Sequence, residues 1–198
     1  PADNADFWSM LKSEWYCHRL NKTPLWNIPL RNYLVRRLLG QVDGVPYNIF
    51  VEQGLLTLSG ENHVDYEDVH RWFVSLVRDY EILPLQIGYD RYSAQYLIED
   101  LRAAGFHCDD VYQGFNLSPV IRETEGLLKD GIIHIGDNNL LKSHLLNTSL
   151  KMEAESGKLK IIKTGPRTRI DGTAALLDAM TVRQKWYADI GEQLKNKR

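Results

Sequence analysis

The chain has 198 residues, of which 43% are hydrophobic and 25% are charged, and its formal net charge is −2. This length allows one large domain or two small ones with a substantial core, and the composition is that of a globular protein. No apolar run approaches the roughly 18 residues that a membrane-spanning helix needs, and no signal peptide is recognisable. The two cysteines, Cys17 and Cys108, form no disulfide framework, which indicates a reducing compartment.

Positive charge is concentrated near the C-terminal end. Between positions 151 and 169 two acids stand against six basic residues, so this segment carries +4 and the rest of the chain −6: Lys151, Lys158, Lys160, Lys163, Arg167 and Arg169. Such a run is often only a solvated face, but it also suits contact with a phosphate backbone. The segment is therefore our candidate surface for binding DNA.

The first half of the chain gives uneven signals. Residues 1–44 are rich in aromatic side chains and poorly readable, and residues 46–60 suggest two short extended pieces around Gly54. A helix is predicted over 65–80, with Asp65 as its N-cap, because apolar side chains recur there at helical spacing. An apolar run that ends in Asp90 predicts a buried strand, and a helix that stops at Gly105 follows it.

The second half alternates in the same way. Residues 107–114 favour a strand, and Ser118 followed by Pro119 predicts the N-cap and first residue of a helix that runs to about Lys129. We expect a strand over 131–136, a helix over 138–150, a hairpin that turns at Ser156-Gly157, and a last helix introduced by Asp171. Strands that alternate with amphipathic helices predict an α/β fold with a mixed sheet.

Two aspartates stand where sites form in such folds. Asp90 ends a strand and Asp171 begins a helix, and carboxylates at one edge of a sheet can hold divalent metal ions. Each also has a plain structural explanation, because Asp171 can cap its helix and Asp90 can pair with the adjacent Arg91. Asp178 lies two turns after Asp171, about 10 Å along the helix, and is too far away to share one metal with it. We expect Asp178 to support the site indirectly or to face solvent.

A series of short motifs in fixed order resembles the nuclease domain of the large terminase subunit of tailed bacteriophages. The resemblance covers residues 45–187 and rests on these positions: Gly88-Tyr89-Asp90, Gln113-Gly114-Phe115, Ser118-Pro119, His134, Asn139, Lys163 and Ile170-Asp171-Gly172. Each motif is short, but the ordered set is specific. The chain then divides into an N-terminal segment (1–44), a nuclease domain (45–187) and a polar C-terminal tail (188–198).

The resemblance implies an RNase H-like mixed sheet flanked by helices and a metal-dependent endonuclease that cuts concatemeric double-stranded DNA during packaging. It implies Asp90 and Asp171 as catalytic metal ligands for two Mg²⁺ or Mn²⁺ ions. It also implies the portal protein and the small terminase subunit as partners, no membrane, and the cytoplasm of the bacterial host as the location. The basic residues expected on DNA are Lys158, Lys160, Lys163, Arg167 and Arg169.

Two departures from the family pattern leave an alternative open. The family's first catalytic aspartate lies on an early strand that we do not find, since no apolar strand precedes Asp3 or Asp6, and we expect the chain to begin after that strand. No GxxxxGK[ST] motif is present either, so we expect a nuclease without its ATPase motor. The alternative is a non-catalytic RNase H-like module that docks DNA or a packaging partner.

Overall fold

A computed structural model describes residues 45–59, 64–91 and 95–196, with side chains as far as position 189. The elements, in chain order, are α5 (Tyr47–Glu52), α6 (Tyr66–Tyr80), β1 (Ile87–Asp90), α7 (Gln95–Ala103), β2 (Cys108–Val111), the 3-10 turn η1 (Phe115–Leu117), α8 (Ser118–Lys129), α9 (Asn139–Leu146), β3 (Thr148–Met152), β4 (Leu159–Lys163) and α10 (Asp171–Asn196). The predictions for residues 1–44, including those for Asp3 and Asp6, lie outside the described residues.

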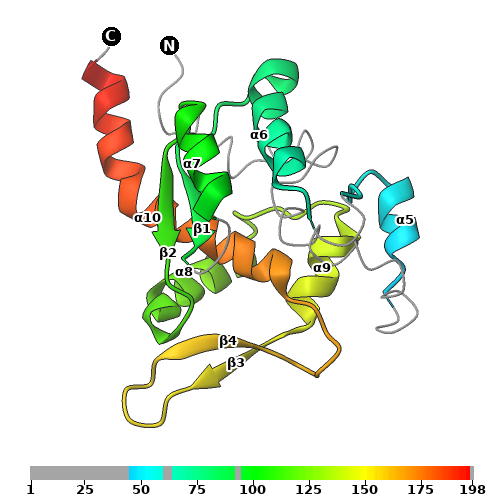
Figure 1. Cartoon of the computed structure of the whole chain (residues 1–198). Coiled ribbons are helices and arrows are strands. Elements are labelled where there is room, and N and C mark those ends of the chain that lie inside the picture. Colours follow the sequence, from blue (N-terminus) through cyan, green and yellow to red (C-terminus); the bar gives the residue numbers. More distant parts are fainter. Residues whose placement is uncertain (1–44, 60–63, 92–94, 197–198) are drawn as a thin grey trace.

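The described strands form two small sheets (Figure 1). Strand β1 pairs in parallel with β2, and β3 pairs with β4 as an antiparallel hairpin that projects from the body of the fold. The predicted α/β class is therefore confirmed, but the described strands form two separate sheets, one parallel and one antiparallel, and not the single mixed sheet that was predicted. None of the described helices is long and apolar enough to cross a membrane.

Three local predictions are confirmed together with their physical causes. The Asp65 side chain accepts a hydrogen bond from the Glu67 amide (3.0 Å) and so caps α6. Helix α7 ends before Gly105, whose φ of 94° is a conformation that favours glycine. The hairpin turns where predicted, with the Glu153 amide bonded to the Lys158 carbonyl (2.8 Å) and Gly157 at φ 65°.

The segment predicted as extended before Gly54 is instead helix α5. The Pro46 carbonyl accepts bonds from the amides of Ile49 (3.1 Å) and Phe50 (3.4 Å), which starts a helical turn. Tyr47 and Phe50 are both buried at a spacing of three, so the apolar pattern here is helical rather than alternating. The prediction of an extended segment up to position 52 is wrong.

The strand predicted over 131–136 is also wrong. The amides of Ile132 and Ile133 both donate to the Leu127 carbonyl (2.9 and 3.1 Å), so this stretch folds back on the end of α8. Gly131 and Gly136 have positive φ angles, which an extended strand does not use. His134, expected in that strand, lies on an exposed loop.

Two boundaries shift slightly. Leu117 is the N-cap of α8, because η1 runs directly into the helix, and Ser118 is the first helical residue rather than the cap. Residues 188–196, predicted as part of a polar tail, continue α10 to Asn196.

The two faces of the β1–β2 pair contact different layers. Ile87 and its partner Cys108 join a core with α6 and α7, whereas Val111 belongs to a second core with α8, β4 and α10. Because side chains alternate along a strand, Gly88 and Asp90 share the face toward α10. A third core joins α5 to α9 through Tyr47, Phe50 and Leu140.

Helix α10 crosses β1 at Gly88. A Cβ at this position would lie 2.5 Å from the Asp178 carbonyl oxygen and 3.2 Å from a Val182 methyl group. These distances leave no room for any side chain at position 88. The crossing therefore fixes how close α10 comes to the strand.

We expect Gly88→Ala to destabilise the protein by about 1–3 kcal/mol, because the backbone of α10 must move away from β1. Urea unfolding measures the change. Gly126→Ala is the matched control, since its Cβ meets nothing within 4 Å and alanine is the better helix former. Equal stabilities of the two variants would contradict the close crossing.

Candidate active site

Asp90 lies at the carboxyl end of β1, opposite Val111 of β2. This edge is where sites assemble in α/β folds, because the chain leaves parallel strands there. The Gly88 crossing brings the backbone of Asp178 against the same strand, two residues before Asp90. The crossing therefore delivers a second carboxyl group to the end of β1.

Asp178 is buried, with 8% of its surface exposed. Its pKa is raised to about 7: burial is the largest cause, the negative charge of Asp90 acts in the same direction, and a hydrogen bond from Gln113 opposes both. The Gln113 Nε2 donates to Asp178 Oδ1, and Gln113 follows directly after β2. The expectation that Asp178 faces solvent is wrong; it is a buried acid whose charge state depends on Asp90.

Asp171 is the first residue of α10 and is half-buried. Its Oδ2 is buried and has no hydrogen-bond partner. Burial raises the pKa of the Asp171 carboxyl, while its own backbone amide and the positive charges of Lys163 and Arg169 lower it. This oxygen therefore does not cap the helix.

Asp171 and Asp178, both on α10, have different electrostatic neighbours. Asp178 has the acid Asp90, whereas Asp171 has the bases Lys163 and Arg169. Seven helical residues separate them by about 10 Å along the axis. The structure thus associates Asp90 with Asp178, and the sharing of a metal by Asp90 and Asp171 stays a prediction.

The start of α10 is held by α9 and the first residue of β3. His144 Nδ1 accepts a hydrogen bond from the Gly172 amide (2.8 Å), and the hydroxyl oxygens of Thr148 and Thr173 are hydrogen-bonded at 2.8 Å. Burial, with the charge of Arg169, lowers the pKa of His144 to about 4, so its imidazole is neutral at pH 7. Sequence reasoning missed His144; its place on the inner face of α9, beside Leu140 and Leu141, was the available signal.

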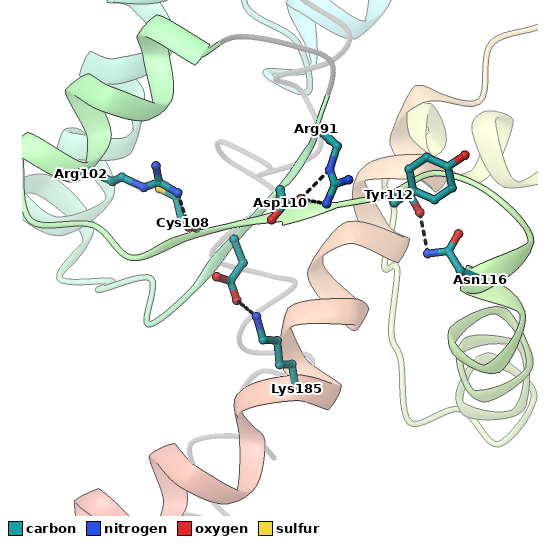
Figure 2. A network of polar contacts seen from close by, with 8 residues as sticks. Arg91, Arg102, Cys108, Asp110, Tyr112, Asn116 and Lys185 are labelled. Atoms are coloured by element: carbon teal, nitrogen blue, oxygen red, sulfur yellow. Dashed lines mark hydrogen bonds and ion pairs between the residues drawn. The ribbon is translucent and has the colours of Figure 1, made fainter.

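Charged side chains of β2 form ion pairs with the end of β1 and with α10 (Figure 2). The Arg91 guanidinium donates to Asp110 through Nε (2.7 Å), and Lys185 of α10 donates to Asp109 (3.0 Å). Each of these exposed ion pairs contributes on the order of 0–1 kcal/mol. Arg91 thus pairs with an aspartate of β2, and its pairing with the adjacent Asp90 stays a prediction.

The basic segment lies along the hairpin and the loop that leads to α10. Lys158, Lys163 and Arg167 are exposed, and the Lys160 Nζ lies 4.8 Å from the centre of the Phe115 ring. Arg169 is only half-exposed and its Nε is buried. The predicted DNA-binding residues are therefore near one another in the fold, but Arg169 is integrated into the site.

The donor groups at this edge are suited to hard divalent cations, since carboxylate oxygens are the ligands that Mg²⁺ and Mn²⁺ take. The unpartnered Oδ2 of Asp171 is one such oxygen. Over the described ranges, no group of three His, Cys, Asp or Glu side chains is placed to hold a metal ion. The described side chains therefore do not by themselves identify a metal site.

The fold is an α/β domain in which Asp90, at the end of a parallel strand pair, lies near the buried Asp178 of α10. The family model described as "Terminase large subunit, endonuclease domain" matches residues 39–185. This match covers well over half of the chain, so the protein belongs to that family.

A curated relative and a solved structure agree with this assignment. The large terminase subunit of Enterobacteria phage HK97 is 27% identical over 139 residues, which is 69% of this chain and 27% of the relative. The crystal structure of the HK97 large terminase has a TM-score of 0.63 at 24% identity, over 73% of this chain and 31% of that one, and shows the shared fold. The chain thus spans about a quarter to a third of the HK97 protein.

We expect Asp178→Asn to make stability less dependent on pH. The folded-state pKa of about 7 exceeds the ordinary 3.8, so the folded protein holds a proton that the unfolded chain loses, and stability falls between about pH 4 and pH 7. Asparagine cannot lose a proton, so the variant should gain roughly 2–3 kcal/mol over the wild type on going from about pH 5 to pH 8. Urea unfolding at both pH values measures this.

Asp130 is exposed, so Asp130→Asn serves as the control and should leave the free energy of unfolding unchanged at both pH values. An Asp178→Asn variant that follows the wild-type pH dependence would show that Asp178 is already charged at pH 5.

Proposed function

We propose that this protein is a metal-dependent endodeoxyribonuclease that cuts concatemeric double-stranded DNA during packaging of a phage or prophage genome. The family assignment supports the nuclease class. The observation that carries the proposal is the association of Asp90, at the end of β1, with the buried Asp178 of α10, whose helix begins with the unpartnered Oδ2 of Asp171. An RNase H-like arrangement of the sheet and helices is part of this proposal and agrees with the likeness to the HK97 structure.

Asp90 and Asp171 are the proposed metal ligands and catalytic residues. Bound Mg²⁺ or Mn²⁺ would polarise the phosphodiester and lower the pKa of the attacking water, and two ions are expected in a complete site. Lys163 and Arg169 partly neutralise Asp171, and Lys163 is exposed enough to meet a phosphate as well.

The hairpin and the following loop form the proposed DNA surface. Lys151 and Lys160 lie opposite each other in the register of β3 and β4, and Lys158, Lys163 and Arg167 are exposed nearby. Like charges placed across a strand pair repel one another, and a phosphate backbone relieves that repulsion. The full packaging complex, with the portal protein and the small terminase subunit in the host cytoplasm, is the proposed setting.

We expect the 198-residue chain to cut plasmid DNA slowly in millimolar Mn²⁺, since Asp90 and Asp171 offer two negative charges against the four of two metal ions. Asp90→Asn and Asp171→Asn should each abolish the cleavage and weaken Mn²⁺ binding measured by calorimetry. Asp130→Asn is the matched control. Rapid cleavage that survives Asp171→Asn would show that the site is wrongly placed, and DNA binding without any cleavage would favour a non-catalytic docking module.

DNA binding should depend steeply on salt and little on sequence, because phosphate contacts release counterions. Replacing Lys158, Lys160 and Lys163 with alanine should reduce the slope of log K against log salt by about 2–3, close to 0.9 for each lost contact. Fluorescence anisotropy with two unrelated duplexes measures both properties. The control removes three charges outside the hairpin (Lys129, Lys142 and Lys185), and an equal loss of slope there would place the DNA elsewhere.

A further inference from the structure

The first turn of α10 is capped from outside the helix. Ile170 precedes the helix and has no polar side-chain atom, although this position usually supplies the acceptor for an amide of the first turn. The Ala174 amide bonds to the Ile170 carbonyl (2.9 Å), while the Gly172 amide bonds to His144 Nδ1 (2.8 Å). A histidine of α9 thus does the work of an N-cap residue.

This arrangement bears directly on Asp171. The carboxylate oxygens of an aspartate at a helix start ordinarily accept hydrogen bonds from the free amides of the first turn. Here one of these amides is already bonded, and Asp171 Oδ2 remains buried without a partner. A buried polar atom without a partner is rare and indicates a missing ligand or stored strain.

The position of His144 is itself strongly determined. Its side chain is 2% exposed, and the N-cap of its helix, Asn138, is fully buried and accepts from the Leu141 amide (2.9 Å). A Cβ on Gly172 would lie 3.2 Å from His144 Nδ1 and 3.2 Å from a Leu141 methyl group, so the imidazole and the backbone are in close contact. The imidazole is therefore packed directly against the start of α10.

Two more bonds hold the same short segment on either side of Asp171. The Asn147 Nδ2 donates to the Arg169 carbonyl (3.2 Å), and Thr148 is bonded to Thr173. The Thr148 hydroxyl also donates to the His144 carbonyl (2.7 Å), which links the two contacts. Residues 169–173 are therefore held before and after Asp171, while its carboxyl group is left unbonded at Oδ2.

We propose that His144 is a positioning residue for Asp171: by capping α10 through the Gly172 amide, it leaves the Asp171 carboxylate free to bind a divalent cation. This inference rests on the proposed metal-dependent function. It assigns to α9 a role in the site that no motif of the sequence indicates.

The test compares two substitutions of similar shape, of which only one keeps a hydrogen-bond acceptor. His144→Asn keeps an acceptor, because its Oδ1 is attached to Cγ as Nδ1 is, whereas His144→Leu places a methyl group there. Mn²⁺ affinity by calorimetry should fall about 10-fold or more in His144→Leu, as for other residues that orient metal ligands, and should be largely kept in His144→Asn. Thr148→Val is the milder variant, to be used if His144→Leu does not fold, and should weaken binding in the same direction.

A second measurement needs no metal. In the NMR spectrum of the metal-free protein, the carboxyl carbon signal of Asp171 should move in His144→Leu and stay in place in His144→Asn. The signal of Asp178, two turns further along α10, is the internal control and should stay in both. If neither the Asp171 signal nor the Mn²⁺ affinity separates the two variants, His144 is only structural and the inference is overturned.

The two proposals can fail separately. A wild-type chain that binds no Mn²⁺ would contradict the metal-dependent function. The Asp171 carboxyl signal would still decide whether His144 sets the position of that side chain.

Discussion

The contact between the backbone of α10 and Gly88 is the constraint on which the site depends. With no side chain at position 88, the helix carbonyl at Asp178 comes as close to β1 as van der Waals contact allows. Asp90 shares the strand face of Gly88, so the approach that buries the helix also brings an acid of the helix toward an acid of the strand. A bulkier residue at position 88 would push α10 away from β1 and would move Asp178 away from Asp90.

The pKa values of His144 in α9 and Asp178 in α10 are shifted in opposite directions. His144 has its pKa lowered to about 4 and Asp178 has its pKa raised to about 7, and burial is the first cause of both. Between about pH 4 and 6.5 the folded state binds one proton fewer at His144 and one more at Asp178 than the unfolded chain does. The two effects on stability therefore oppose each other in that window, each on the order of 3–4 kcal/mol in full. A nearly flat pH dependence of stability can thus conceal two strongly perturbed groups.

Sequence reasoning succeeded where the signal was local. The amphipathic pattern and cap of α6, the stop at Gly105 and the turn at Gly157 each depend on neighbouring residues, and the structure contains all of them. It failed for two short apolar runs, because periodicity alone does not separate a strand from a helix or a turn there. The apolar run at 131–135 resembles a strand but folds onto Leu127, and Tyr47 and Phe50 are helical because both are buried.

The candidate site likewise contains residues that the sequence reveals and residues that only the fold reveals. Asp90 and Asp171 are visible from their positions at element ends, whereas the burial of Asp178 requires knowing that α10 crosses β1 at Gly88. His144 is recognisable only once α9 is packed against the start of α10, because 28 positions separate it from Gly172, whose amide donates the hydrogen bond to it. Residues that carry a site's chemistry leave a pattern in sequence, while those that position them are specified by the packing.

The two bases near Asp171 differ in what they can offer to DNA. Both lower the pKa of the Asp171 carboxyl, but Lys163 is exposed at the end of β4, whereas Arg169 has a buried Nε and a carbonyl bonded to Asn147. A phosphate can draw on Lys163 without disturbing the backbone, since its flexible stem carries the charge into solvent. Arg169 is tied to the segment that holds Asp171, so its charge stays with the carboxylate whether or not DNA is bound. The basic segment is thus divided, with its hairpin part directed to a ligand and its last residue part of the site.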